Sequence, residues 1–232
     1  ASDVKMSEDR PYRRTSSYCY GGAMEDSLEF TLVFGVTEER KSSLGEYDRC
    51  EMQRIASWLT GHRDYRWLQV IQDDLAAVRY RCYITDLEAV EVGGRHWGFQ
   101  CKVHCDSPYG YLLPKSFTYE VNGTATVKLH SDSSTNDPYS PVLSIKQSDG
   151  TKFSVVNKTD NNRSFTLDGI PTGAGTILLD SDKGVLTCEA GLNLYPYCNF
   201  KFPRLLRGDN ELTLTGTGTF TFTCEFPVNV GG

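Results

Sequence analysis

The last part of the chain alternates apolar and hydroxyl-bearing residues, and this pattern strongly limits the folds it can adopt. Between residues 212 and 226, Leu, Phe and Cys occupy even positions and Thr occupies most odd positions. Successive residues of a β-strand point to opposite faces, so one face of this segment belongs in a core and the other outside it. Gly216, Thr217 and Gly218 interrupt the pattern, and we interpret them as the turn of a β-hairpin.

The rest of the second half shows the same strand character. Apolar residues alternate along 117–121 and again along 125–129, and no stretch has helical periodicity. Short strands follow, separated by turn clusters at 148–150, 160–162 and 180–184. Regularly spaced short strands predict an antiparallel sandwich or jelly roll.

The first half combines strands with one helix. Leu28–Phe34 alternates as a strand, and two further strands are expected at 78–84 and 96–105. A helix is predicted at 48–60, with Asp48 as its N-cap and Glu51 completing a capping box.

A boundary between two domains is expected in the segment 106–114. This segment carries two prolines and a glycine, which break regular structure. We therefore predict two domains, 1–107 and 108–232, in a mainly β chain. The N-terminal domain is expected to combine strands with one helix, and the C-terminal domain to be an antiparallel sandwich or jelly roll.

Composition excludes several functional classes. The 232 residues carry a formal net charge of −6, whereas nucleic-acid binding needs clustered Lys and Arg. No apolar run approaches the roughly 18 residues of a membrane-spanning helix. No charged-then-apolar leader is visible at the N-terminus, so we expect neither membrane insertion nor a signal peptide.

The eight cysteines indicate unpaired thiols rather than a metal site or a disulfide framework. None forms a CxxC motif. Cys101 and Cys105 flank His104, but on a strand His104 points away from both. The two cysteines would lie about 13 Å apart, at roughly 3.3 Å per strand residue. That separation is too long for a disulfide or a shared ion.

No other motif points to catalysis or to a bound cofactor. The four histidines lie in no recognisable catalytic pattern, and Asp180-x-Asp182-x-Gly184 fails the calcium-loop template because Val185 stands where glycine is needed. Asn157-Lys158-Thr159 matches the N-glycosylation acceptor motif, which matters only in a secreted eukaryotic protein. We name no catalytic, cofactor-binding or metal-binding residue. The Asn, Asp and Tyr residues of the second half leave sugar binding open.

Several stretches resemble the distal tail proteins of phages with long, non-contractile tails. They are the helix segment 54–59, the aromatic and arginine-rich strand 79–84, the segment 105–111, and Phe202-Pro203-Arg204-Leu205-Leu206-Arg207-Gly208-Asp209-Asn210, which precedes the alternating segment. The resemblance covers roughly residues 10–228, although family members usually have more chain before the position that matches Tyr12. The positions taken as the family signature are Asp106, Ser107, Pro108, Tyr109, Phe202, Pro203, Leu205, Gly208, Asn210 and Gly216.

The resemblance implies a structural role without catalysis. The N-terminal domain would be a β-sandwich with one helix that assembles into a homohexameric ring, and the C-terminal domain would be a galectin-like sandwich. The ring would join the tail tube protein to tail-tip, baseplate and receptor-binding proteins of the virion. Assembly in the reducing bacterial cytoplasm fits unpaired cysteines. The alternative is a stand-alone carbohydrate-binding β-sandwich module, and host-surface carbohydrate remains a candidate partner.

Overall fold

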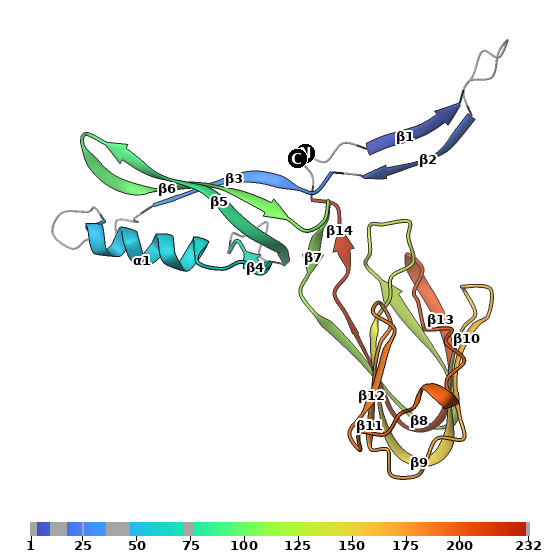
Figure 1. Ribbon diagram of the computed structural model, residues 1–232. Coiled ribbons are helices and arrows are strands. Elements are labelled where there is room, and N and C mark those ends of the chain that lie inside the picture. The colour runs from blue at the N-terminus through green and yellow to red at the C-terminus, as the bar shows by residue number, and fades with distance from the viewer. Residues whose placement is uncertain (1–3, 10–17, 25, 36–46, 72–76, 231–232) are drawn as a thin grey trace. The chain divides into compact units, whose positions relative to one another are not determined.

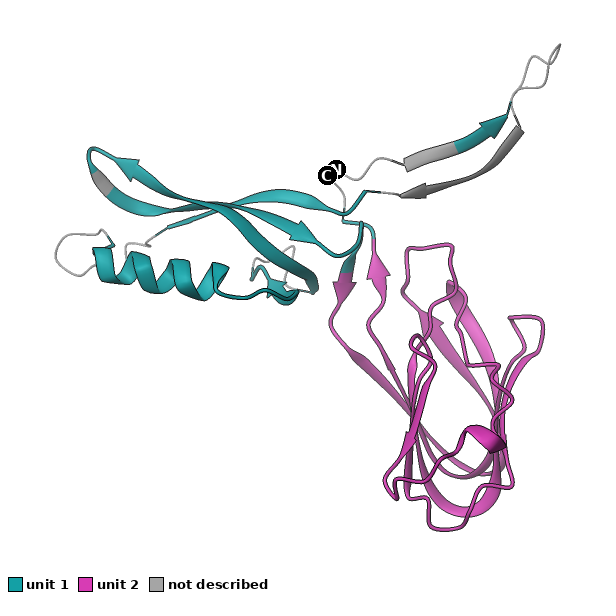
Figure 2. Ribbon diagram, viewed as in Figure 1, with its two compact units in different colours: residues 1–110, 229–232 teal, residues 111–228 magenta. Residues whose placement is uncertain are grey.

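The chain forms two compact units in the computed structural model, which describes residues 4–9, 18–24, 26–35, 47–71 and 77–230. The first unit is residues 1–110 with 229–232, and the second is residues 111–228 (Figure 2). The fold is mainly β with one helix, as predicted (Figure 1). Two short strands, β7 (Gly110–Leu112) and β14 (Pro227–Val228), lie where the chain passes between the units.

The first unit is built on an antiparallel sheet. The strands of this sheet that lie wholly within the first unit are β3 (Glu29–Gly35), β4 (Arg66–Gln69), β5 (Val78–Val92) and β6 (Arg95–Cys105). Strand β6 lies between β5 and β3, and β4 pairs with the start of β5. A separate two-stranded sheet is formed by β1 (Val4–Asp9) and β2 (Tyr18–Met24).

The helix α1 (Arg49–Thr60) begins and ends at the predicted signals. The Glu51 amide donates to Asp48 Oδ1 at 2.7 Å, and the Asp48 amide donates to Glu51 Oε2 at 3.1 Å. These two bonds form the capping box. The Gly61 amide closes the last turn by donating to the Ser57 carbonyl at 2.9 Å. The predicted helix is confirmed, yet none of its residues is fully buried.

One face of the N-terminal sheet carries a small core. The buried side chains of its main cluster are Leu28, Tyr80, Cys82, Val103 and Cys105. His104 lies on the opposite face, where Nδ1 is 2.6 Å from Glu29 Oε1 and Nε2 is 2.9 Å from Thr85 Oγ1. The predicted orientation of His104, away from the neighbouring cysteines, is therefore confirmed.

The second unit consists of one six-stranded antiparallel sheet that folds over its own core. Its strands are β8 (Lys115–Ser131), β9 (Val142–Asn157), β10 (Arg163–Asp168), β11 (Thr176–Asp180), β12 (Val185–Cys188) and β13 (Gly208–Cys224). The order is β12-β11-β9-β13-β8, with β10 also paired to β9. A short 3₁₀ helix, η2 (Tyr195–Tyr197), lies between β12 and β13.

The predicted hairpin at Gly216–Gly218 is wrong. Strand β13 is continuous and pairs with β8 along its whole length, from Gly208↔Ser131 to Cys224↔Lys115. Both glycines face inward, where the backbone meets other parts of the fold. A Cβ at Gly216 would lie 2.4 Å from Phe153 Cδ1, and one at Gly218 would lie 2.3 Å from the Lys146 carbonyl oxygen. The glycines therefore permit close approach at a corner of the strand rather than a chain reversal.

The same correction applies to one of the predicted turn clusters. Residues 148–150 lie inside β9, where its pairing with β13 shifts register, instead of separating two strands. The clusters at 160–162 and 180–184 do connect strands, β9 to β10 and β11 to β12. Long strands with internal irregularities thus replace several of the short strands that were expected.

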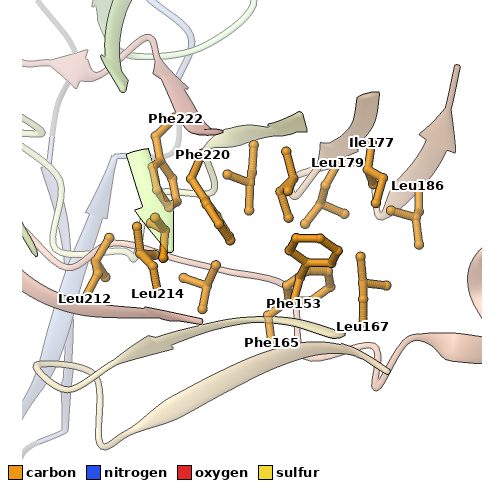
Figure 3. Close-up of a cluster of buried hydrophobic side chains, with 14 of the residues drawn as sticks. Phe153, Phe165, Leu167, Ile177, Leu179, Leu186, Leu212, Leu214, Phe220 and Phe222 are labelled. Atoms are coloured by element: carbon orange, nitrogen blue, oxygen red, sulfur yellow. The ribbon is translucent and has the colours of Figure 1, made fainter. Parts of the chain in front are cut away.

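The two halves of β13 contribute to opposite layers of the core. Figure 3 shows Phe220 and Phe222 on one side, with Ile177, Leu179 and Leu186, and Leu212 and Leu214 on the other side, with Phe165 and Leu167. The inward positions of β13 are confirmed. Outward hydroxyls pair across to β8, with Oγ1 atoms of Thr118 and Thr221 3.2 Å apart.

Replacing Phe222 by Ala should destabilise the C-terminal unit by about 3–5 kcal/mol, because the ring is fully buried. Replacing Thr221 by Ala should cost less than about 1 kcal/mol, since its hydroxyl makes a partly exposed hydrogen bond. Chemical denaturation of the two variants measures both losses. Equal losses would contradict the assigned register of β13.

Candidate assembly interface

The signature residues after β6 form a turn that ties three strands together. The Asp106 amide donates to the Arg81 carbonyl at 2.9 Å, and the Leu28 amide donates to the Ser107 carbonyl at 3.1 Å. Ser107 Oγ lies 3.3 Å from the Tyr109 amide, which donates to it. Pro108 and Tyr109 are half-buried. These backbone bonds hold the end of β6 against β5 and the start of β3.

The second signature segment centres on Asn210, whose side chain is completely buried. Asn210 Oδ1 accepts from the Leu206 amide at 2.8 Å and from Asn157 Nδ2 at 2.9 Å. Its own Nδ2 donates to the carbonyls of Leu206 and Gly208, at 2.7 and 3.0 Å. One amide side chain therefore satisfies four hydrogen-bonding groups, as a buried amide must.

An ion pair fastens the same segment to the β9–β10 turn. Arg204 Nε and Nη2 donate to the two Asp160 oxygens at 2.6 and 3.0 Å. The Asp160 side chain is only 5% exposed. The Arg204 guanidinium lowers the pKa of the Asp160 carboxyl through this hydrogen bond. The pair thus stabilises the ionised carboxylate in the folded chain.

The remaining signature residues also serve the fold. Phe202 stacks on Phe165 with ring centroids 6.2 Å apart, and Pro203 is buried beside it. Leu205 is 1% exposed and exchanges backbone hydrogen bonds with Tyr139 at 2.7 and 2.8 Å. Gly208 has φ +83°, a conformation that favours glycine.

Sequence reasoning missed the partners of these signature residues. In the sequence, Asn157 matches only the N-glycosylation motif. In the structure its side chain is buried, and its amide nitrogen donates a hydrogen bond to the Arg204 carbonyl at 2.9 Å. Asp160 was assigned to a turn, without a partner. These contacts join residues more than forty positions apart, so no local pattern could have shown them.

The first unit exposes an aromatic surface between its helix and its sheet. A cavity of about 230 Å³ lies there, lined among others by Trp58, Leu59, Trp67, Leu68, Tyr83 and Ile84. Trp58 is 70% exposed and Trp67 46% exposed. The Arg79 guanidinium lies 3.9 Å from the centroid of the Trp67 ring. Aromatic residues and Arg are enriched in protein interfaces, so this surface is the best candidate for a contact with another protein.

We searched the described residues for metal-binding groups and for reactive thiols. No group of three or more His, Cys, Asp or Glu side chains there is arranged to hold a metal ion. Burial raises the pKa of Cys82 to about 11 and that of Cys105 to about 12, so both thiols stay protonated at neutral pH. In the part of the chain that the structure describes, no helix is long and apolar enough to span a bilayer.

Two solved structures similar to this fold are phage proteins. The Dit protein of phage SPP1, described as a paradigm of the hub adsorption apparatus in phages that infect Gram-positive bacteria, has a TM-score of 0.67 at 13% identity. The alignment covers 97% of this chain and 89% of that one. A chain of the phage P2 baseplate in its activated, calcium-containing conformation has a TM-score of 0.51 at 13% identity, with 96% and 87% covered. At these identities the similarity concerns the fold.

Family models match both halves of the chain. The model described as "Phage tail protein N-terminal domain" matches residues 1–107, and the one described as "Phage tail C-terminal domain" matches residues 109–224. No curated protein matches the chain. Together the two models span nearly the whole sequence, and on this evidence the chain belongs to the phage tail protein family.

Proposed function

We propose that this protein is the structural hub of a long, non-contractile phage tail. In this role it forms a homohexameric ring that joins the tail tube to tail-tip, baseplate and receptor-binding proteins. Membership of the phage tail family supports the proposal, as does a fold shared over almost the full chain with a Dit hub protein. The protein is then a component of the virion, assembled in the host cytoplasm, and it acts through contacts rather than catalysis.

The observation that carries this proposal is the unequal burial of the two units. Among the described residues, the main core cluster of the first unit holds five buried hydrophobic side chains, against twenty-two in the second unit. The helix α1 has no buried residue, and Trp58 beside the cavity is largely exposed. Apolar surface left uncovered in a single copy favours burial against a neighbour.

We therefore assign the ring contacts to residues 1–107 and the galectin-like sandwich to residues 108–232. A closed ring needs two different surfaces on each subunit, since each subunit meets its neighbours head to tail. The aromatic surface around Trp58 supplies one. Strand β3 supplies the other, because it lies at the end of the sheet order and carries backbone groups that a neighbouring segment can pair with.

The comparisons favour a tail protein over a stand-alone carbohydrate-binding module. The polar side chains of the second unit agree with this preference. The amides of Asn157, Asn199 and Asn210 are all hydrogen-bonded within the chain. Side chains committed in this way are not free to recognise sugar hydroxyls.

We further propose that the signature residues Phe202–Asn210 act as a structural lock for the sandwich, not as a binding site. Their contacts reach β9, β10 and the segment at Tyr139. The lock sets the loop geometry from which β13 starts.

Self-association should be measurable on the full chain. We expect light scattering to give a mass well above that of one copy, and electron microscopy to show rings. Trp58→Glu should reduce the mass because it places a charge in the proposed contact. Leu192→Glu, at a 41% exposed residue of the second unit, is the matched control and should leave the mass unchanged. Rings that survive Trp58→Glu would disprove the assigned surface, and absence of the protein from purified virions would disprove the hub role.

The lock should show as a pH-dependent loss of stability in Asp160→Asn. The loss should be about 1–2 kcal/mol near pH 7, at the lower end for charged hydrogen bonds because Arg204 is 41% exposed. Arg204 lowers the folded-state pKa of Asp160, so its stabilisation is complete above the ordinary Asp pKa and is lost as pH falls through the lowered value. The difference between wild type and variant should therefore shrink below about pH 4. Asp168→Asn removes an exposed pair with Lys152 and should cost much less; equal losses would rule out the lock.

A further inference from the structure

Phe200 is held in a backbone conformation that its side chain disfavours. Its φ is +59°, in the left-handed region where a bulky residue is a genuine outlier. Burial does not account for the choice of residue, because Phe200 is 59% exposed. Glycine or asparagine would adopt this backbone with less strain. A strained residue that shows an apolar ring to solvent is a reason to look for function.

The loop around Phe200 is fixed by its neighbours. Asn199 Oδ1 accepts from the amides of Thr166 and Lys201, both at 3.1 Å, and Asn199 Nδ2 donates to the Ser164 carbonyl at 2.8 Å. The backbone of Asn199 adds a further bond to the Thr166 carbonyl. These contacts attach the loop to β10, so Phe200 is presented outward by a rigid support.

Two aromatic rings hold the Phe200 ring in place. Tyr195 stacks with it at a centroid distance of 6.1 Å and an interplanar angle of 12°. Phe202 meets it edge-on at 6.4 Å and 88°, and itself stacks on the buried Phe165. The exposed ring is thus connected to the core of the sandwich. An aromatic side chain already ordered before binding loses little entropy on docking.

The polar groups next to the ring are already used. The Tyr195 hydroxyl accepts from the Leu186 amide at 3.0 Å and donates to the Gly184 carbonyl at 3.4 Å. The Asn199 amide is committed to β10 and to the Lys201 amide. A sugar needs convergent polar groups for its hydroxyls, whereas an apolar protein pocket needs only the ring. Lys201 follows directly, is exposed, and forms no ion pair with any described residue.

We propose that Phe200 is a docking anchor that inserts into an apolar pocket of another tail protein, with an acidic side chain at the pocket rim facing Lys201. The exposed ring of Phe200 requires an apolar pocket, and the exposed Lys201 ammonium favours an acidic side chain beside it. The identification of the partner as a tail protein rests on the proposed function, whereas the assignment of Phe200 as an anchor rests on the loop itself.

Phe200→Asn is the decisive variant, because it keeps the left-handed backbone and removes the ring. The melting temperature of the purified full chain should stay within a few degrees of wild type. Phage carrying this variant should lose at least tenfold in titre, with particles that lack one or more tip proteins. Leu113→Asn, which also replaces an exposed apolar residue of the second unit, should leave titre unchanged. A large fall in melting temperature, or an unchanged titre for Phe200→Asn, would overturn the proposal.

Cross-linking in intact particles tests the partner directly. A benzophenone amino acid placed at position 200 should form a covalent link to an apolar segment of a second virion protein, identified by mass spectrometry. A link only to another copy of this chain, or no link, would overturn the proposal. Retention of the purified wild-type chain in gels containing glucan, galactan or chitin oligosaccharide, lost in Phe200→Asn, would make the ring a sugar platform and also overturn it. If the protein is missing from the particles, the hub function fails first, and mass spectrometry of the particles distinguishes that case.

Discussion

The corner of β13 at Gly216 and Gly218 is the constraint on which the C-terminal domain depends. A straight strand of this length would extend beyond one layer of the sandwich. Only glycine fits where the backbone of β13 approaches Phe153 and the Lys146 carbonyl. Because the strand turns there without changing its inward and outward alternation, its two halves supply both layers of one core. Strands β8 and β9 follow the same path because they pair with β13 along both halves.

Closing the sheet over itself gives the second unit a complete core, which has no equivalent among the described residues of the first unit. One face of the N-terminal sheet carries a small cluster of buried side chains. No side chain of the helix α1 is fully buried. The second unit buries its apolar side chains through its own contacts, while the described part of the first unit leaves Trp58 and Trp67 exposed. This division suits a ring component, in which assembly is coupled to completing the burial of apolar surface.

Within a few residues, the loop before β13 changes from an exposed aromatic ring at Phe200 to buried and hydrogen-bonded side chains at Leu205 and Asn210. The Arg204 guanidinium, the Leu205 backbone and the Asn210 amide form hydrogen bonds to other parts of the second unit. Phe200, a few positions earlier, turns its ring outward at the cost of backbone strain. Contacts of Asn199, Tyr195 and Phe202 hold this loop in place despite the backbone strain at Phe200.

Elements whose causes are local can be predicted from the amino-acid sequence alone. The Asp48 and Glu51 capping box, the alternation of 28–34 and 78–84, and the inward face of β13 all follow from residues within one element. The local signal of Gly216-Thr217-Gly218 was the same for a hairpin turn and for a corner in one strand. Only the packing of Phe153 and β8 against it decided between them. Likewise the partners of Asn210 and Asp160, and the exposure of Trp58 and Phe200, depend on residues far away in the chain, because burial and hydrogen bonding are set by which elements meet in space.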